Sequence, residues 1–129
     1  MRLLLDTHVF LWLDSADARI PAGVREACED GRNEVFLSLA SVWEMQIKTA
    51  LGKMRPPISS VALAEAYLDN GTLKALPVGL AHIRELGMLP ASHGDLFDRM
   101  LVAQARYEGF TLVSADRVMG EYPVDVLWE

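Results

Sequence analysis

The hydrophobic positions of the chain form short continuous runs separated by longer stretches of helical spacing. Residues 2–6 and 35–39 are almost continuously apolar, which predicts buried parallel strands rather than strands with one wet face. Residues 73–78 and 110–114 have the same character, and residues 124–127 predict a short last strand.

Between these runs, apolar residues recur three or four positions apart. Trp43, Ile47 and Leu51 form such a stripe, which predicts a helix from residue 41 until Gly52 and the prolines that follow it. Further helices are expected over residues 22–30, 61–69, 80–89 and 95–108, the last with Asp95 as its N-cap. Strands alternating with helices predict an α/β fold of one domain, residues 1–129, with a mainly parallel sheet covered on both faces.

Composition narrows the function classes. The net charge of −6 has the wrong sign for binding nucleic acid through bulk electrostatics. A nucleic-acid role would need bound cations or a local basic patch, for which Lys48, Lys53 and Arg55 are candidates.

Cys28 is the only cysteine, which excludes an internal disulfide and Cys-x-x-Cys zinc sites. No apolar run is long enough for a membrane span, so we expect a cytoplasmic protein without membrane partners.

Four acids stand where predicted strands pass into helices: Asp6, Glu44, Asp98 and Asp116. The carboxyl ends of parallel strands share one edge of a sheet, so these side chains are expected to converge. Carboxylates 4 Å apart repel by about 4 kcal/mol per pair at an effective dielectric near 20, so such a cluster needs cations. Oxygen-only ligands favour Mg²⁺ or Mn²⁺ over zinc, and phosphoryl-transfer enzymes use such ions.

Each acid also has an ordinary structural interpretation. Ser41-x-x-Glu44 matches a capping box, and Asp98 is a favourable first-turn charge behind the Asp95 cap. Asp6 and Asp116 match strand-end turn residues. The histidines have no metal-ligand spacing and are expected to be structural or exposed, with His82 on a helix of surface type. The three are His8, His82 and His93.

Four segments together resemble the PIN-domain ribonucleases, and within them the VapC-type toxins of toxin-antitoxin pairs. They are residues 4–8 (LLDTH), 38–44 (SLASVWE), 95–105 (DLFDRMLVAQA) and 112–116 (LVSAD). The resemblance implies a three-layer α/β/α PIN-like fold and a metal-dependent endoribonuclease. By this resemblance, Asp6, Glu44 and Asp98 match the three core acids of the family, and Asp116 matches a fourth acid that is more variable. Ser114 and Thr7 are expected to support the site.

The same resemblance implies a homodimer, cellular RNA as the substrate, and inhibition by a cognate antitoxin, a VapB-like or similar small DNA-binding protein. Apolar residues in the N-terminal segment are candidates for the surface that dimerises and binds the antitoxin. They are Phe10, Trp12 and Leu13.

Two other classes stay open at this point. A receiver-like phosphoacceptor domain also gathers acids around Mg²⁺ at strand ends, but it needs paired acids at the first strand, where Thr7 and His8 follow Asp6. A haloacid-dehalogenase-like phosphatase would need an acid at position 8. A PIN-like module that has lost catalysis and only binds a partner is the third possibility.

Overall fold

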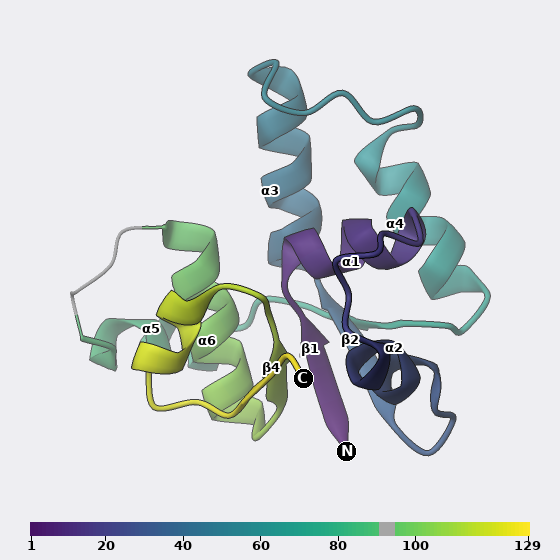
Figure 1. The fold of residues 1–129 in the computed structure, drawn as a ribbon. Helices are drawn as coiled ribbons and strands as arrows, with labels where there is room; N and C mark the ends of the chain where they lie inside the picture. The colour runs from purple at the N-terminus through teal and green to yellow at the C-terminus, as the bar shows by residue number, and fades with distance from the viewer. Residues whose placement is uncertain (91–94) are drawn as a thin grey trace.

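Five strands, six α-helices and one 3₁₀ helix make up the described part of the chain, residues 1–90 and 95–129 of a computed structural model (Figure 1). His93 lies outside the described residues. In chain order, the strands are β1 (Arg2–Leu5), β2 (Glu34–Ser38), β3 (Lys74–Leu76), β4 (Thr111–Val113) and β5 (Val126–Leu127). The helices are α1 (Thr7–Asp14), α2 (Ala22–Glu29), α3 (Leu39–Ala50), α4 (Ser60–Asp69), α5 (Leu80–Met88), α6 (Leu96–Glu108) and η1 (Arg117–Glu121).

The strands form one sheet in the order β3-β2-β1-β4-β5, and every neighbouring pair is parallel. The register places Leu4 beside Phe36 on one side and Leu112 on the other. The expected α/β fold with a mainly parallel sheet is therefore confirmed. Since β1 lies between β2 and β4, the turns that follow the first and fourth strands are neighbours at the carboxyl edge.

Each face of the sheet has its own core, as the period of two along a strand requires. Leu3 and Leu5 of β1 point to the face covered by α1, α2, α3 and α4, whereas Leu4 points to the face covered by α5, α6 and η1. Figure 1 shows α5 and α6 on one side of β1 and β4, with α2 and α4 on the other. Three layers result, and the continuous apolar runs of the sequence are explained by burial on both faces.

The two helices that carry Glu44 and Asp98 begin in different ways. Helix α6 is capped as predicted, because the Asp95 carboxylate accepts from the backbone N–H groups of Phe97 and Asp98. Helix α3 starts at Leu39, with Ser38 as the N-cap accepting from Ala40 N at 3.1 Å. The predicted capping box at Ser41 is therefore wrong: Ser41 lies inside the helix, and Glu44 is in its second turn.

One further expectation about exposure is wrong, and the choice left open for His82 is decided. Phe10 is only 1% exposed and packs in the core, so it cannot belong to an exposed partner surface. His82 lies on α5 but is buried, with its Nδ1 accepting from Gly79 N at 2.9 Å, which is a structural role. None of the helices in the described ranges is both long and apolar enough to cross a membrane.

Candidate metal centre

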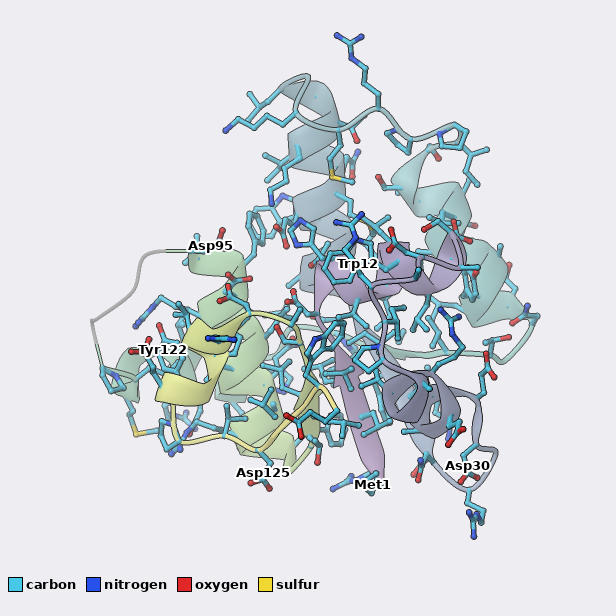
Figure 2. All side chains as sticks on the ribbon, viewed as in Figure 1. Met1, Trp12, Asp30, Asp95, Tyr122 and Asp125 are labelled. Atoms are coloured by element: carbon cyan, nitrogen blue, oxygen red, sulfur yellow. The ribbon has the colours of Figure 1, made fainter. Side chains whose placement is uncertain are left out.

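The four candidate acids reach one pocket from four separate elements. Asp6 is the residue between β1 and α1, and Asp116 caps η1 just after β4. Glu44 comes from the second turn of α3 and Asp98 from the first turn of α6. All four line a pocket of about 420 Å³. Figure 2 places Trp12 and Asp95, which also line it, at the end of the molecule away from Met1 and Asp125.

A serine joins two of these acids across neighbouring strand ends. Ser114 Oγ donates to Asp6 Oδ2 at 2.7 Å and accepts from Asp116 N at 3.1 Å. Asp6 is buried, and burial raises the pKa of its carboxyl above the ordinary range, although the Ser114 hydrogen bond opposes this shift. Ser114 therefore fixes the orientation of Asp6 and the path of the backbone into Asp116.

Glu44 is held by residues from two helices. Thr7 Oγ1 donates to Glu44 Oε1 at 2.7 Å and lies 2.9 Å from Ser41 Oγ. The ammonium of Lys48, one turn further along α3, pairs with Glu44 Oε2. The hydrogen bond to Glu44 is the main cause that raises the pKa of Lys48 above its usual value. Both oxygens of this buried carboxylate thus have protein donors.

Asp98 lies where a negative charge on its carboxylate is unfavourable. In the part of the chain that the structure describes, no hydrogen-bond donor or cation contacts its carboxylate. Burial raises the pKa of Asp98 to about 7, and the negative charges of Asp6, Asp95, Glu44 and Asp116 add to the shift. A carboxylate that is partly desolvated, unpaired and surrounded by like charges is a preferred place for a cation.

The rim of the pocket holds residues that the sequence did not place beside the acids, since Trp12 was expected on a surface for a partner. Trp12 lies half-buried on α1, and the Arg19 guanidinium stacks over its ring with Cζ 4.6 Å from the ring centroid. Lys48 was expected in a basic patch, not between the acids. The spacing of Lys48 four residues after Glu44 on one helix is a local signal that could have revealed the pair. Arg19 has no such signal, because it precedes α2 in a loop.

The donor set agrees with a hard divalent cation, since the four candidate acids and Asp95 line the pocket, the hydroxyls of Thr7 and Ser114 contact two of these acids, and none of the described lining residues carries sulfur. Across residues 1–90 and 95–129, however, no three His, Cys, Asp or Glu side chains already stand in a metal-binding geometry. Thr7 and Lys48 contact the two carboxylate oxygens of Glu44, and Asp6, Asp98 and Asp116 do not form such a group within the described ranges either. The chemistry of the residues fits a metal, and the positions of their oxygens would have to adjust.

The comparisons with known proteins agree with the fold. VapBC2 from Rickettsia felis bound to a promoter DNA fragment superposes with a TM-score of 0.74 at 14% identity, over 100% of both chains. DNA-bound VapBC from Salmonella typhimurium gives 0.72 at 17% identity, over 98% of this chain and 97% of that one. VapBC-1 from nontypeable Haemophilus influenzae gives 0.71 at 15%, with the same coverage.

At these identities the likeness concerns the fold. No curated protein matches the chain. The family model described as PIN domain matches residues 3–124. Because this match runs from the first strand past the last strand-end acid, the chain belongs to the PIN domain family.

Proposed function

We propose that the chain is a metal-dependent endoribonuclease and the VapC-type toxin of a toxin-antitoxin pair, acting on cellular RNA in the cytoplasm. Asp6, Glu44, Asp98 and Asp116 are the acids of its metal site. The observation that carries the proposal is the meeting of these four acids, from four elements, in one pocket at the carboxyl edge of the sheet. Membership of the PIN domain family supports it.

The residues of the proposed site have two roles: the acids bind the metal ion, and two hydroxyls orient the acids. Asp6 and Asp98 would hold Mg²⁺ or Mn²⁺, with Asp116 and Glu44 completing the acidic set. When bound, such an ion activates water and stabilises the leaving oxygen of a phosphodiester. Ser114 and Thr7 orient the carboxylates of Asp6 and Glu44 through hydrogen bonds of 2.7 Å each.

Local positive charge supports a polyanionic substrate. The chain has a net charge of −6 and cannot attract RNA as a whole. Arg19 lines the same pocket as the acids, stacks on Trp12 and pairs with Asp17 at 2.8 Å, so a phosphate would share its guanidinium with that carboxylate, beside an aromatic ring that can meet a base. The acidic pocket therefore has a cation and a ring at its rim.

An antitoxin partner is proposed from the resemblance to VapC-type toxins, and the VapBC assemblies with similar chains support it. A homodimer is proposed on the same ground. Exposed apolar side chains on α3, α6 and the segment after β3 offer surface for such contacts: Leu39, Trp43, Val78 and Leu96.

Co-expression of the chain with the product of a short reading frame immediately upstream should relieve the growth arrest that the chain causes and yield a complex of the two proteins. Growth arrest unaffected by that product would contradict the antitoxin assignment.

The decisive experiment is cleavage of labelled RNA by the wild-type chain and by Asp98→Asn, with Mn²⁺ or with EDTA. The amide keeps the shape of the side chain and removes the charge that a cation needs. Activity should fall by more than about 100-fold, since losses up to that size are typical of groups that merely support metal ligands. Asp125→Asn is the matched control, because this acid lies at the opposite end of the molecule and should leave cleavage unchanged (Figure 2). Cleavage of RNA by Asp98→Asn at the wild-type rate in saturating Mn²⁺ would rule out the assignment of Asp98 to the metal site.

A receiver-like domain is not supported. Receivers of the flavodoxin type have the strand order 2-1-3-4-5, whereas the order here is 3-2-1-4-5. Incubation with acetyl phosphate should therefore leave the protein without a phosphoryl group. A binding module without catalysis is distinguished by the cleavage experiment itself.

A further inference from the structure

Glu44 differs from the other candidate acids because each of its two carboxylate oxygens has a hydrogen-bond donor from the protein. It is buried at 2% exposure, with Thr7 on Oε1 and Lys48 on Oε2. Lys48 is half-buried, with 29% of its side chain exposed, so solvent screens this ion pair in part. By contrast, no donor in the described part of the chain contacts the Asp98 carboxylate.

The charges of the pocket show what this pairing does. Five carboxylates, those of the four candidate acids and of Asp95, line the pocket together with the cations of Lys48 and Arg19, and two-metal sites hold divalent ions about 3.5 to 4 Å apart. Lys48 already places one positive charge against Glu44, inside the same pocket. A second divalent ion at Glu44 would have to displace the ammonium or accept it as a close neighbour of like charge, and both are unfavourable.

We propose that Lys48 is a built-in counter-ion that replaces a second divalent cation at Glu44, so that the pocket holds one metal ion on the side of Asp6, Asp98 and Asp116. Lys48 is a positioning residue in this arrangement, because it acts through Glu44. The inference rests on the proposed function and refines it by fixing the number of ions.

The test is the number of Mn²⁺ ions bound per chain, measured by equilibrium dialysis or by the spin-resonance signal of free Mn²⁺. Wild type should bind one. Lys48→Met removes the charge at similar length and should bind a second Mn²⁺, whereas Lys48→Arg should still bind one. Lys74→Met is the matched control, since Lys74 pairs with Glu34 on the surface and its loss should not add a site.

A second variant covers the case in which Lys48→Met does not fold with Glu44 left uncompensated. Glu44→Gln keeps a hydrogen-bond acceptor for Thr7 and should still bind one Mn²⁺, because the ion lies on the other acids. Loss of that ion would overturn the inference, as would two ions bound by wild type or a single ion bound by folded Lys48→Met. Two ions in wild type would leave the proposed metal site intact, whereas no ion at all would overturn both proposals.

Discussion

At the scale of single residues, burial decides which side chains can react. Cys28 lies on α2 and packs against the core formed with β1 and β2. Burial raises the pKa of its thiol to about 11, and the neighbouring Glu29 adds to the shift. Since the thiolate is the reactive form, Cys28 is inert at neutral pH. The single cysteine is a packing residue in this fold.

Alkylation measures this directly. In the native protein at pH 8, iodoacetamide should modify Cys28 on the order of 100-fold more slowly than an ordinary cysteine, because so little thiolate is present. In concentrated urea the rate should return to that of a cysteine peptide, which is the control. Equal rates in native and unfolded protein, followed by mass spectrometry, would contradict the burial described here.

At the scale of elements, the start of α3 connects the two faces of the sheet. Ser38 ends β2, caps α3, and donates to Gln104 Oε1 of α6 at 2.6 Å. Gln104 is fully buried, and its amide nitrogen in turn reaches Pro77 O at 3.3 Å. One serine therefore fixes the helix that carries Glu44 against the helix that carries Asp98.

Two serine caps provide a matched pair for testing this connection. Ser59 caps α4 at an exposed site, so Ser59→Ala should cost about 1 kcal/mol in the free energy of unfolding. Ser38→Ala loses a similar cap and also leaves the buried Gln104 oxygen without its donor. The additional cost should be about 1 to 3 kcal/mol. Urea unfolding measures both, and equal losses would show that the contact with Gln104 does not stabilise the fold.

At the scale of the whole molecule, the acid cluster makes stability depend on pH. The pKa values of Asp6 and Asp98 are raised in the folded state, that of Asp98 to about 7. The folded state therefore binds these protons more tightly than the unfolded chain does. Their stabilising contribution is complete below about pH 4 and is lost as pH rises through 7. The lowered pKa values of Asp17, Asp30 and Glu34 act in the opposite direction, but only at acidic pH.

In EDTA, the melting temperature should consequently fall between pH 5.5 and pH 8. Mn²⁺ should raise it more at pH 8 than at pH 5.5, because deprotonated carboxylates bind the ion. Asp98→Asn should flatten the fall in EDTA and weaken the response to Mn²⁺. Scanning calorimetry or thermal fluorescence measures each curve. A melting temperature in EDTA that rises over this range would show that the pKa values of Asp6 and Asp98 are not raised in the folded state.

Much of this arrangement was determined by the sequence alone. Continuous apolar runs, the cap at Asp95 and the helical stripe through Trp43 predicted the strands and helices, because these signals depend on spacing within one element. Asp6 and Asp116 follow strands, and Glu44 and Asp98 lie near the starts of helices, which together predicted one shared edge, since every strand of a parallel sheet ends on the same side. The acidic pocket follows from this topology without knowledge of any contact.

Only the tertiary structure decided the rest. Local spacing could not show that Ser38 rather than Ser41 caps α3, that Phe10 packs in the core, or that Thr7 donates to Glu44. Each of these outcomes depends on an element distant in the chain: α6 for Ser38, α4 and its neighbours for Phe10, and the Thr7 end of α1 for Glu44. A sequence pattern shows which residues share a face, but the element packed against that face decides which of them are buried and with what they pair.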